Sequence, residues 1–375
     1  MRSPADSGRL DALFVAALDL SGEARAAFIA KECAGEPGLE ERLQELIRLA
    51  ESDAVLSASM QRQTDPSAHP AAPGPPLAPG SILGRYEIRE VLGSGGQGHV
   101  YCALDPSLDR EVAIKALAGA FQGDPANLRR FEREARVLAA LSHPNIAAIY
   151  GFERIDGAPY LVLEKIDGGT LAQRIARGPL PVREALTIAI QVAEGLAEAH
   201  GKEVVHRDLK PSNVMLSPEG RVKLVDFGLA KSTATRTRSV SSNLTTMVGA
   251  VVGTAPYMSP EQIQGDEVDA RTDLWAFGCL VYEMLTGRPA FSGRTLAEVV
   301  AAVLRDEPDL AALPGATPPE LRKVIERCLR KDPNHRLRSI SDVRIELVDV
   351  LAGASVPMLR DSGATPAPVK SPARS

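Results

Sequence analysis

The apolar residues near the start of the chain recur at helical spacing in two stretches, residues 10–18 and 39–50. Residues 1–60 are therefore predicted to form a small helical module, whose apolar stripes need a surface to pack against. The periodicity then ends, and residues 61–82 contain six prolines. Such a composition forms neither helix nor sheet, so it predicts a semi-stiff linker.

From residue 83 onward the pattern changes from polar linker to alternating strands. Short apolar runs at residues 86–92 and 112–117 predict β-strands, and longer helical periodicities follow as far as residue 352. This order predicts an α+β architecture, with a sheet-rich lobe before a helical one. Residues 353–375 have four prolines and no aromatic residue, which predicts a disordered tail.

One lysine of the second predicted strand shares a face with apolar residues. Strict alternation places Lys115 beside Ala113 and Leu117. An edge-strand lysine that extends to water is the simpler interpretation. In the helix predicted next, however, Glu134 lies on the buried side, where a carboxylate needs a cation. An ion pair between Lys115 and Glu134 is therefore expected, with the ammonium directed toward phosphate groups.

Composition excludes several classes of protein. The chain has 375 residues, and its formal net charge of -5 disfavours nucleic acid as a partner. The four cysteines show no C-x-x-C spacing, so neither a disulfide framework nor a zinc site is indicated. No apolar run approaches the roughly 20 residues that span a bilayer, and no signal peptide is evident. We expect a cytoplasmic protein without membrane insertion.

Residues 93–98 read GSGGQG, which fits the pattern G-x-G-x-x-G. Such loops bring backbone N–H groups close to phosphate oxygens, although an isolated match is equally compatible with a flexible turn. A dinucleotide-binding loop opens a helix, whereas the residues after Gly98 favour a strand. The loop is therefore predicted to join two strands, and a dinucleotide-binding fold is excluded.

The most specific signal is the segment HRDLKPSN at residues 206–213, followed by DFG at residues 226–228. Nine fixed positions make coincidence improbable, on the order of one in a billion, and disfavour a merely solvated charged loop. With these motifs, the chain over about residues 86–351 resembles the protein kinase family, and within it the bacterial serine/threonine kinases of eukaryotic type. The resemblance implies a two-lobed fold, with an antiparallel sheet and one helix in the N-lobe and a mainly helical C-lobe.

The resemblance also implies roles for individual residues. Asp208 would accept or orient the proton of the substrate hydroxyl, Lys210 would neutralise charge on the transferred group, and Glu134 would orient Lys115. Asn213 and Asp226 would bind Mg²⁺, with Mn²⁺ as an alternative. On hydrophobicity alone, ordinary core is the simpler interpretation of the apolar residues in the implied pocket, and only the resemblance assigns them to ATP. ATP would be held by Leu92, Gly93, Ser94, Gly95, Gly96, Gln97, Gly98, Val100, Ala113, Lys115, Glu164, Ile166 and Met215.

Other matched residues have implied structural roles. His206 would pack against Phe227, Glu261 would pair with Arg336, and Asp273 would brace the catalytic loop. Lys210 together with Thr254 indicates serine or threonine acceptors. The implied activity is ATP-dependent phosphorylation of protein Ser/Thr hydroxyls. A pseudokinase that serves as a nucleotide-binding scaffold, and a kinase of small molecules, are the alternatives.

The segment between Lys231 and Thr246 is rich in serine and threonine. A solvated polar loop is the simple interpretation. Arg207, next to the catalytic Asp208, would gain an anionic partner if this segment were phosphorylated. Autophosphorylation at Thr245 or Thr246 is the hypothesis, and self-association would bring two copies together for it.

Overall fold

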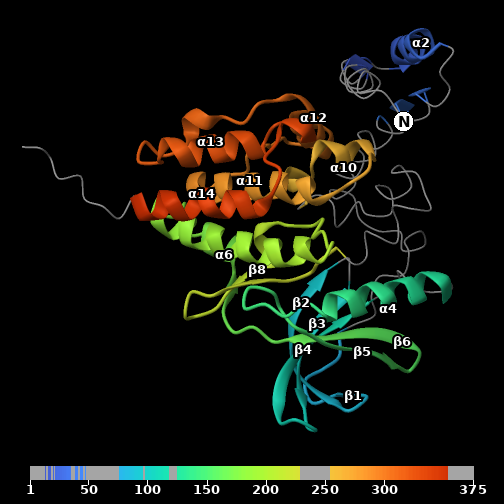
Figure 1. Ribbon diagram of the computed structural model, residues 1–375. Helices are drawn as coiled ribbons and strands as arrows, with labels where there is room; N and C mark the ends of the chain where they lie inside the picture. Colours follow the sequence, from blue (N-terminus) through green and yellow to red (C-terminus); the bar gives the residue numbers. More distant parts are fainter. Residues whose placement is uncertain are drawn as a thin grey trace, which may run out of the picture.

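The computed structural model describes residues 76–95, 98–117, 125–228 and 254–353, together with parts of residues 13–47. Figure 1 shows two lobes in the main part of the chain, a sheet with one long helix and a larger group of helices. The predicted order of a sheet-rich lobe followed by a helical lobe is therefore confirmed.

The first lobe is an antiparallel sheet in the order β1-β2-β3-β4-β6-β5. One of its faces forms a core around Ile88, Ile114 and Val162, as the alternation of apolar residues requires. Tyr86 closes an edge of this core by donating a hydrogen bond of 2.6 Å to Glu153. The strands are β1 (Ile82–Leu83), β2 (Tyr86–Gly95), β3 (Gly98–Asp105), β4 (Arg110–Ala116), β5 (Ile149–Ile155) and β6 (Ala158–Glu164).

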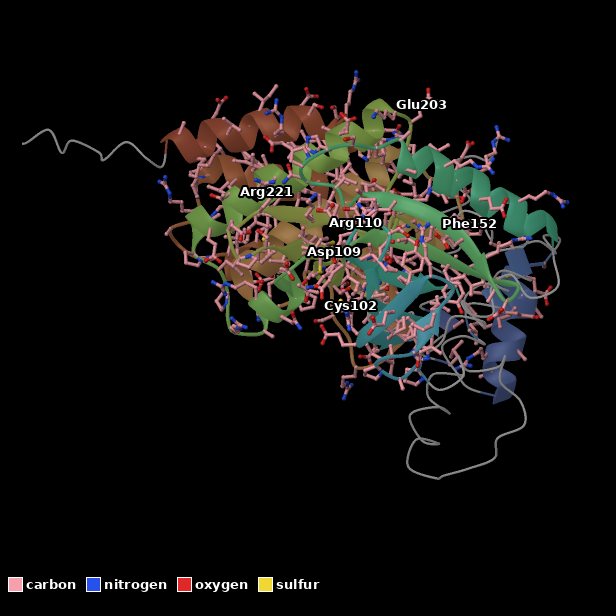
Figure 2. The ribbon with its side chains drawn as sticks, turned by 90° about the horizontal axis from the view of Figure 1, so that it is seen from below. Cys102, Asp109, Arg110, Phe152, Glu203 and Arg221 are labelled. Carbon is pink, nitrogen blue, oxygen red and sulfur yellow. The ribbon has the colours of Figure 1, made fainter. Side chains whose placement is uncertain are left out.

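The opposite face of the sheet is covered by the helix α4 (Pro125–Ala139). Phe131 and Ala135 of this helix form a small core with strand residues that include Leu117. Phe152 of β5 lies toward α4 in Figure 2, and its ring centroid is 5.9 Å from that of Phe131. Because Lys115 is on the same face of β4 as Leu117, it lies on the side of the sheet that α4 covers.

The second lobe is built around α11, which is buried along most of its length, with Trp275 fully inside. Asp269 begins α11 by accepting a hydrogen bond from the N–H of Arg271, and Gly287 ends it at φ 72°, a conformation that favours glycine. The other helices are α5 (Leu171–Ile175), α6 (Val182–Gly201), α10 (Pro260–Gln264), α12 (Leu296–Arg305), α13 (Pro319–Cys328) and α14 (Ile340–Gly353), and α11 itself is Ala270–Thr286.

Short elements complete the structure, and some of them carry the motifs. They are the strands β7 (Gly169–Thr170), β8 (Val214–Leu216) and β9 (Val222–Leu224), and the 3-10 turns η1 (Pro211–Asn213), η2 (Ala255–Tyr257), η3 (Leu310–Ala312) and η4 (Pro333–His335). The strands β7, β8 and β9 form a second, antiparallel sheet. The catalytic motif therefore leads directly into β8, and the DFG motif follows β9.

The N-terminal helical module is also present, in part, among the described residues. Leu13, Ala17, Leu43 and Ile47, which come from the two predicted stripes, are buried together in a core of their own. Between the stripes lies α2 (Gly22–Glu32), a helix that the apolar pattern did not indicate.

The end of the proline-rich stretch is attached to the sheet. Leu77 packs against the sheet core, and its N–H donates to the hydroxyl of Tyr101. The N–H of Gly80 donates to the carbonyl of Ile88, 2.7 Å away. The rest of the predicted linker and the predicted tail lie outside the described residues. In the described part of the chain, no helix is both long and apolar enough to cross a bilayer.

Candidate functional site

The glycine-rich loop connects β2 to β3, as predicted, and not a strand to a helix. Gly98 has φ 115°, a conformation that L side chains rarely adopt, which explains glycine at this position. Ser94 and His99 face each other across the hairpin, with Ser94 Oγ 2.8 Å from His99 Nδ1. Leu92 and Gly93 are exposed where the hairpin begins. Gly96 and Gln97 lie outside the described residues.

Lys115 forms an ion pair different from the expected one. Its Nζ lies 2.7 Å from Asp226 Oδ1, while among the described residues no ion pair joins Lys115 to Glu134. The apolar stripe of α4 is correct, since Phe131 and Ala135 are buried. Periodicity sets which side of a helix faces the sheet but not its distance from the sheet, so it cannot decide between two carboxylates for one ammonium. The structure thus joins the strand lysine to the DFG aspartate.

The catalytic segment gathers a carboxylate, a cation and a hydroxyl. Lys210 Nζ lies 3.0 Å from Asp208 Oδ2 and donates a hydrogen bond of 2.8 Å to Thr254 Oγ1. Asn213 Nδ2 donates to both the carbonyl oxygen and Oδ2 of Asp208, at 2.8 and 3.0 Å. The side chain of Asp208 is 5% exposed, so this carboxylate is held at the edge of the lobe with little freedom.

The backbone of the catalytic segment is fixed by one buried carboxylate at the start of α11. Asp273 accepts hydrogen bonds from the N–H groups of His206 and Arg207, at 2.7 and 2.9 Å. It also lies 2.8 Å from Nε2 of His200 on α6. Arg207 has φ 62°, and its carbonyl accepts a bond from Gln262. Asp273 thus contacts the catalytic segment through backbone hydrogen bonds, the arrangement that bracing would require.

His206 is a packing residue with both ring nitrogens in use. Its ring centroid lies 4.4 Å from that of Phe227, as expected from the sequence. Nε2 is 3.1 Å from the carbonyl of Val225, and Nδ1 accepts from the N–H of Asp208. Burial lowers the pKa of His206, which keeps the imidazole neutral.

This lowered pKa predicts a pH dependence of stability. Below the ordinary histidine pKa of 6.5, the unfolded chain binds a proton that the folded chain does not, so the free energy of unfolding falls as the pH falls. The slope due to His206 is expected to reach about 1.4 kcal/mol per pH unit. Urea unfolding from pH 7.5 to 5 should show this slope in the wild type and its loss in His206→Gln. Equal slopes in both proteins would contradict it.

The donor set beside Asp208 fits a magnesium–nucleotide complex. The amide of Asn213 donates to Asp208 through Nδ2, which turns its Oδ1 the other way. The N–H of Val225 donates to the carbonyl of Asn213, and this brings Asp226 close to it along the chain. Amide and carboxylate oxygens are hard ligands that suit Mg²⁺, and Lys115 adds a cation for phosphate.

The implied adenine-binding residues come from three strands. Val100 and Ala113 belong to paired strands of the large sheet, and Met215 lies on β8 of the second sheet. Ala113 is buried, while Val100 and Met215 are partly exposed. Ile166 follows β6 in the connection between the lobes and is also partly exposed.

Glu164 has a side-chain role that sequence reasoning missed. The resemblance places it only among the residues that would hold ATP. In the structure its Oε2 accepts a bond of 3.0 Å from the N–H of Ala148 and lies 2.8 Å from Nζ of Lys223. Lys223 is on β9, three residues before Asp226. The carboxylate therefore joins the hinge to the strand that positions the DFG aspartate. The only signal in the sequence was the opposite charge of Glu164, at the connection between the lobes, and Lys223, just before the DFG motif.

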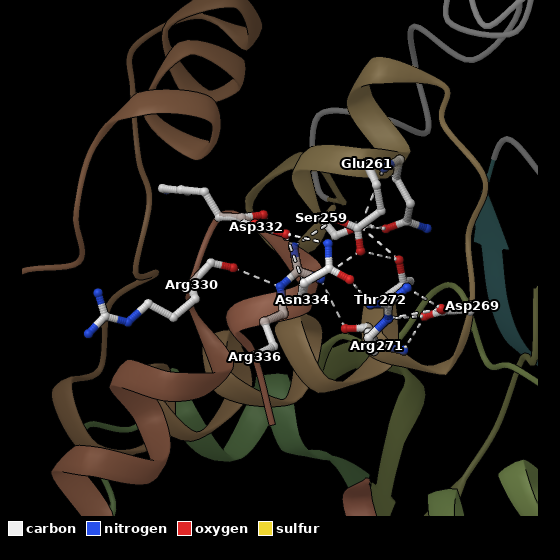
Figure 3. A network of polar contacts seen from close by, with 11 residues as sticks. Ser259, Glu261, Asp269, Arg271, Thr272, Arg330, Asp332, Asn334 and Arg336 are labelled. Atoms are coloured by element: carbon white, nitrogen blue, oxygen red, sulfur yellow. Dashed lines mark hydrogen bonds and ion pairs between the residues drawn. The ribbon is translucent and has the colours of Figure 1, made fainter. Parts of the chain in front are cut away.

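The predicted pair of Glu261 and Arg336 is present and is the centre of a network (Figure 3). The two guanidinium nitrogens of Arg336 donate to the two carboxylate oxygens of Glu261, at 2.6 and 2.7 Å. Thr272 adds a third hydrogen bond of 2.8 Å. Burial acts to raise the pKa of Glu261, but the hydrogen bonds and the charge of Arg336 hold it below its ordinary value.

Ser259 is the first residue of a capping box, a role not inferred from the sequence. Its hydroxyl accepts from the N–H of Gln262 while the side chain of Gln262 accepts from its N–H. The serine and glutamine at this spacing were the available signal. Because Gln262 also donates to the carbonyl of Arg207, the cap of α10 reaches the catalytic segment.

Nε of Arg207 is buried and has no hydrogen-bond partner in the described part of the chain. The predicted phosphorylation sites, Thr245 and Thr246, lie outside the described residues. Thr254 is buried, and its hydroxyl accepts a hydrogen bond from Lys210.

Comparison with known proteins agrees with this geometry. Residues 86–344 match the protein kinase domain family. The chain is 42% identical over 286 residues to a probable serine/threonine-protein kinase of Streptomyces coelicolor, SCO3848, covering 74% of this chain and 42% of that protein. It is 38% identical over 281 residues to the serine/threonine-protein kinase PknB of Mycobacterium tuberculosis, covering 73% of this chain and 44% of that protein. The chain thus spans less than half the length of the curated relatives it matches.

Solved structures show the same fold. The PknI kinase domain of Mycobacterium tuberculosis superposes with a TM-score of 0.58 at 28% sequence identity, covering 73% of this chain and 99% of that chain. The comparisons give no support to a pseudokinase, because the curated relatives are named as kinases. The chain therefore belongs to the protein kinase family, with bacterial serine/threonine kinases of eukaryotic type as its relatives and the two-lobed protein kinase fold.

Proposed function

We propose that the protein transfers the γ-phosphoryl group of ATP to serine or threonine hydroxyls of other proteins. The observation that carries this proposal is the contact of Lys210 with both Asp208 and Thr254. Through these contacts, Lys210 connects Asp208, the proposed proton acceptor, to the segment before α10. A hydroxyl presented at this segment would lie between a proton acceptor and a cation, which is the arrangement that phosphoryl transfer requires.

Each residue then has a separable task. Asp208, held by Asn213, accepts or orients the proton of the attacking hydroxyl at Oδ. Lys210 places a positive charge beside that carboxylate, where negative charge develops on the phosphoryl oxygens. Lys115 offers its ammonium to the nucleotide phosphates, and Glu134 is proposed to compete with Asp226 for it. Orientation and charge neutralisation supply most of the rate, because the protein has little covalent work to do.

The nucleotide and metal follow from the same residues. ATP with Mg²⁺ would supply the transferable phosphoryl group and neutralise part of its charge. Asn213 and Asp226 would hold the metal through oxygen atoms, and Val100, Ala113 and Met215 would contact the base. We place the protein in the cytoplasm, since its four buried cysteines form no disulfide among the described residues.

Transfer of radiolabel from γ-labelled ATP tests this function. A basic protein rich in serine should become labelled by the wild type, with phosphoserine or phosphothreonine after hydrolysis. The variant Lys115→Met should transfer far less label, because it lacks the cation beside the phosphates. Label that passes only to small molecules would replace the proposal by a metabolite kinase. Nucleotide binding without any transfer would identify a pseudokinase.

Phosphorylation of the segment before Thr254 is proposed to raise the activity. Arg207 holds a buried Nε without a partner among the described residues, and a phosphothreonine brings a charge of about -1.5 to -2 that a guanidinium binds strongly. We expect the double variant Thr245→Ala with Thr246→Ala to lose this activation. Rates measured after preincubation with ATP should rise for the wild type and not for the variant.

The Asp208→Asn protein, mapped by mass spectrometry, is the control for the source of the phosphate. It should carry no phosphate on Thr245 or Thr246 if one copy of the chain modifies another. Equal phosphorylation in that protein would assign the modification to a different kinase. Unchanged activation in the double alanine variant would remove these threonines from the mechanism.

A further inference from the structure

In the part of the chain that the structure describes, one side chain is shared between the N-terminal module and the helical lobe. Val300 of α12 packs against the core of the helical lobe and also against the separate core that contains Ile29, Leu43 and Ile47. Phe28 of α2 and Leu39 border the same module core. The module therefore has a contact with the kinase lobe, although the sequence predicted a linker between them. Figure 1 shows α2 beyond α10 and α12, at the end of the molecule far from the sheet.

The place of this contact matters because of the other elements that α12 contacts. It packs against η2, the turn that directly follows Thr254, and it also contacts α10. Thr254 is joined to Lys210, which is joined to Asp208. A protein that presents a hydroxyl to Asp208 must extend over this region, so its neighbouring surface meets α12 or whatever covers it.

We propose that the N-terminal module docks on α12 in cis and restricts the access of folded protein substrates, while short peptides reach Asp208 freely. The proposal rests on the proposed kinase activity for its consequence, but the docking itself does not. Among the described residues, only this partly buried valine belongs to both cores, so the described contact is small. Covalent attachment of the module raises its effective concentration, so a weak contact is populated and still reversible. A folded substrate can then compete with the module.

The chain offers a matched pair of variants. Val300→Asp puts a charge into the shared apolar contact. Val299→Asp makes the same change one residue earlier on α12, at a partly buried valine that packs against neither core as far as the structure describes them. Val300→Ala removes two methyl groups and keeps the helix, in case the aspartate variant does not fold. Thermal unfolding of each full-length variant verifies the fold.

Hydrogen exchange in the full chain tests the docking without any assay of catalysis. Amides of α2 and α12 should exchange faster in Val300→Asp than in the wild type, to a smaller extent in Val300→Ala, and unchanged in Val299→Asp. Equal exchange in the wild type and both Val300 variants would overturn the docking. So would an equal increase in Val299→Asp. These outcomes stand even if no phosphate is transferred to any protein.

Steady-state kinetics test the consequence. The substrates are a short serine peptide and a folded protein, the full-length Asp208→Asn chain. For Val300→Asp, kcat/KM on the folded substrate should rise at least about fivefold, the lower range of coupling between sites, while kcat/KM on the peptide stays within a factor of two. Faster exchange with unchanged ratios would show that the module docks but does not restrict access, which would overturn the proposal.

Discussion

Replacing Asp208 by asparagine lowers the rate of phosphoryl transfer by about 10²–10⁴-fold, the usual contribution of a positioned general base. The substitution removes the proton acceptor and keeps the shape of the side chain. An asparagine oxygen still accepts from Asn213 and Lys210, so the hydrogen bonds around the position survive. The substitution leaves the pair of Lys115 with Asp226 unchanged, and it lies outside the strands that are proposed to hold the nucleotide. The affinity for ATP is therefore expected to stay within a few-fold of the wild type.

Single-turnover rates and calorimetric titration with ATP measure the two quantities separately. The control is Asp342→Asn, the same change at an exposed aspartate of α14. This control should transfer phosphate at the wild-type rate. An Asp208→Asn protein with turnover within tenfold of the wild type would show that Asp208 is not the proton acceptor. A loss of ATP binding in it would show that the change has damaged the fold or the cleft.

Replacing Arg336 by leucine lowers the free energy of unfolding by about 3–5 kcal/mol, the cost of leaving one partner of a buried pair without its counter-ion. The guanidinium of Arg336 is fully buried and Glu261 is 8% exposed. The hydrogen bonds that Arg336 donates to the carbonyls of Arg330, Lys331 and Arg271 are lost together with the pair.

Urea unfolding measures this effect, and an exposed pair provides the control. Arg327 lies 3.3 Å from Glu346 with about half of its side chain exposed, so Arg327→Leu should change stability by less than about 1 kcal/mol. The loss of unfolding free energy in the double variant Glu261→Gln with Arg336→Leu should be smaller than the sum of the losses in the two single variants, because no unpaired buried charge remains. Additive effects would show that the two side chains do not stabilise the fold as a pair.

Most of the fold could be predicted from apolar periodicity. The strands at residues 86–92 and 112–117 and the buried side of α4 follow directly from the pattern. Motif spacing added pairs that are distant in sequence, such as Glu261 with Arg336, because a fixed fold implies which residues meet. These contacts are strongly specified, since a buried charge without its partner is costly.

The remainder depended on distances that a pattern does not contain. Lys115 contacts Asp226 and not Glu134, since the position of α4 relative to the sheet is set by packing. Glu164 pairs with Lys223, 59 residues away, a contact that no local pattern in the sequence specifies. The contact of Val300 joins two segments whose separate stripes give no indication of each other.

The way in which Asp273 holds the catalytic segment has a consequence for how such enzymes can change. Asp273 accepts hydrogen bonds from the backbone N–H groups of His206 and Arg207. The position of Asp208 therefore does not depend on the side chain of Arg207. A single nucleotide change at codon 207 would therefore leave the loop in place, and under the proposed activation it would also remove the guanidinium that binds the phosphate. Under that proposal, dependence on phosphorylation is a trait that a lineage with this architecture can gain or lose in one step.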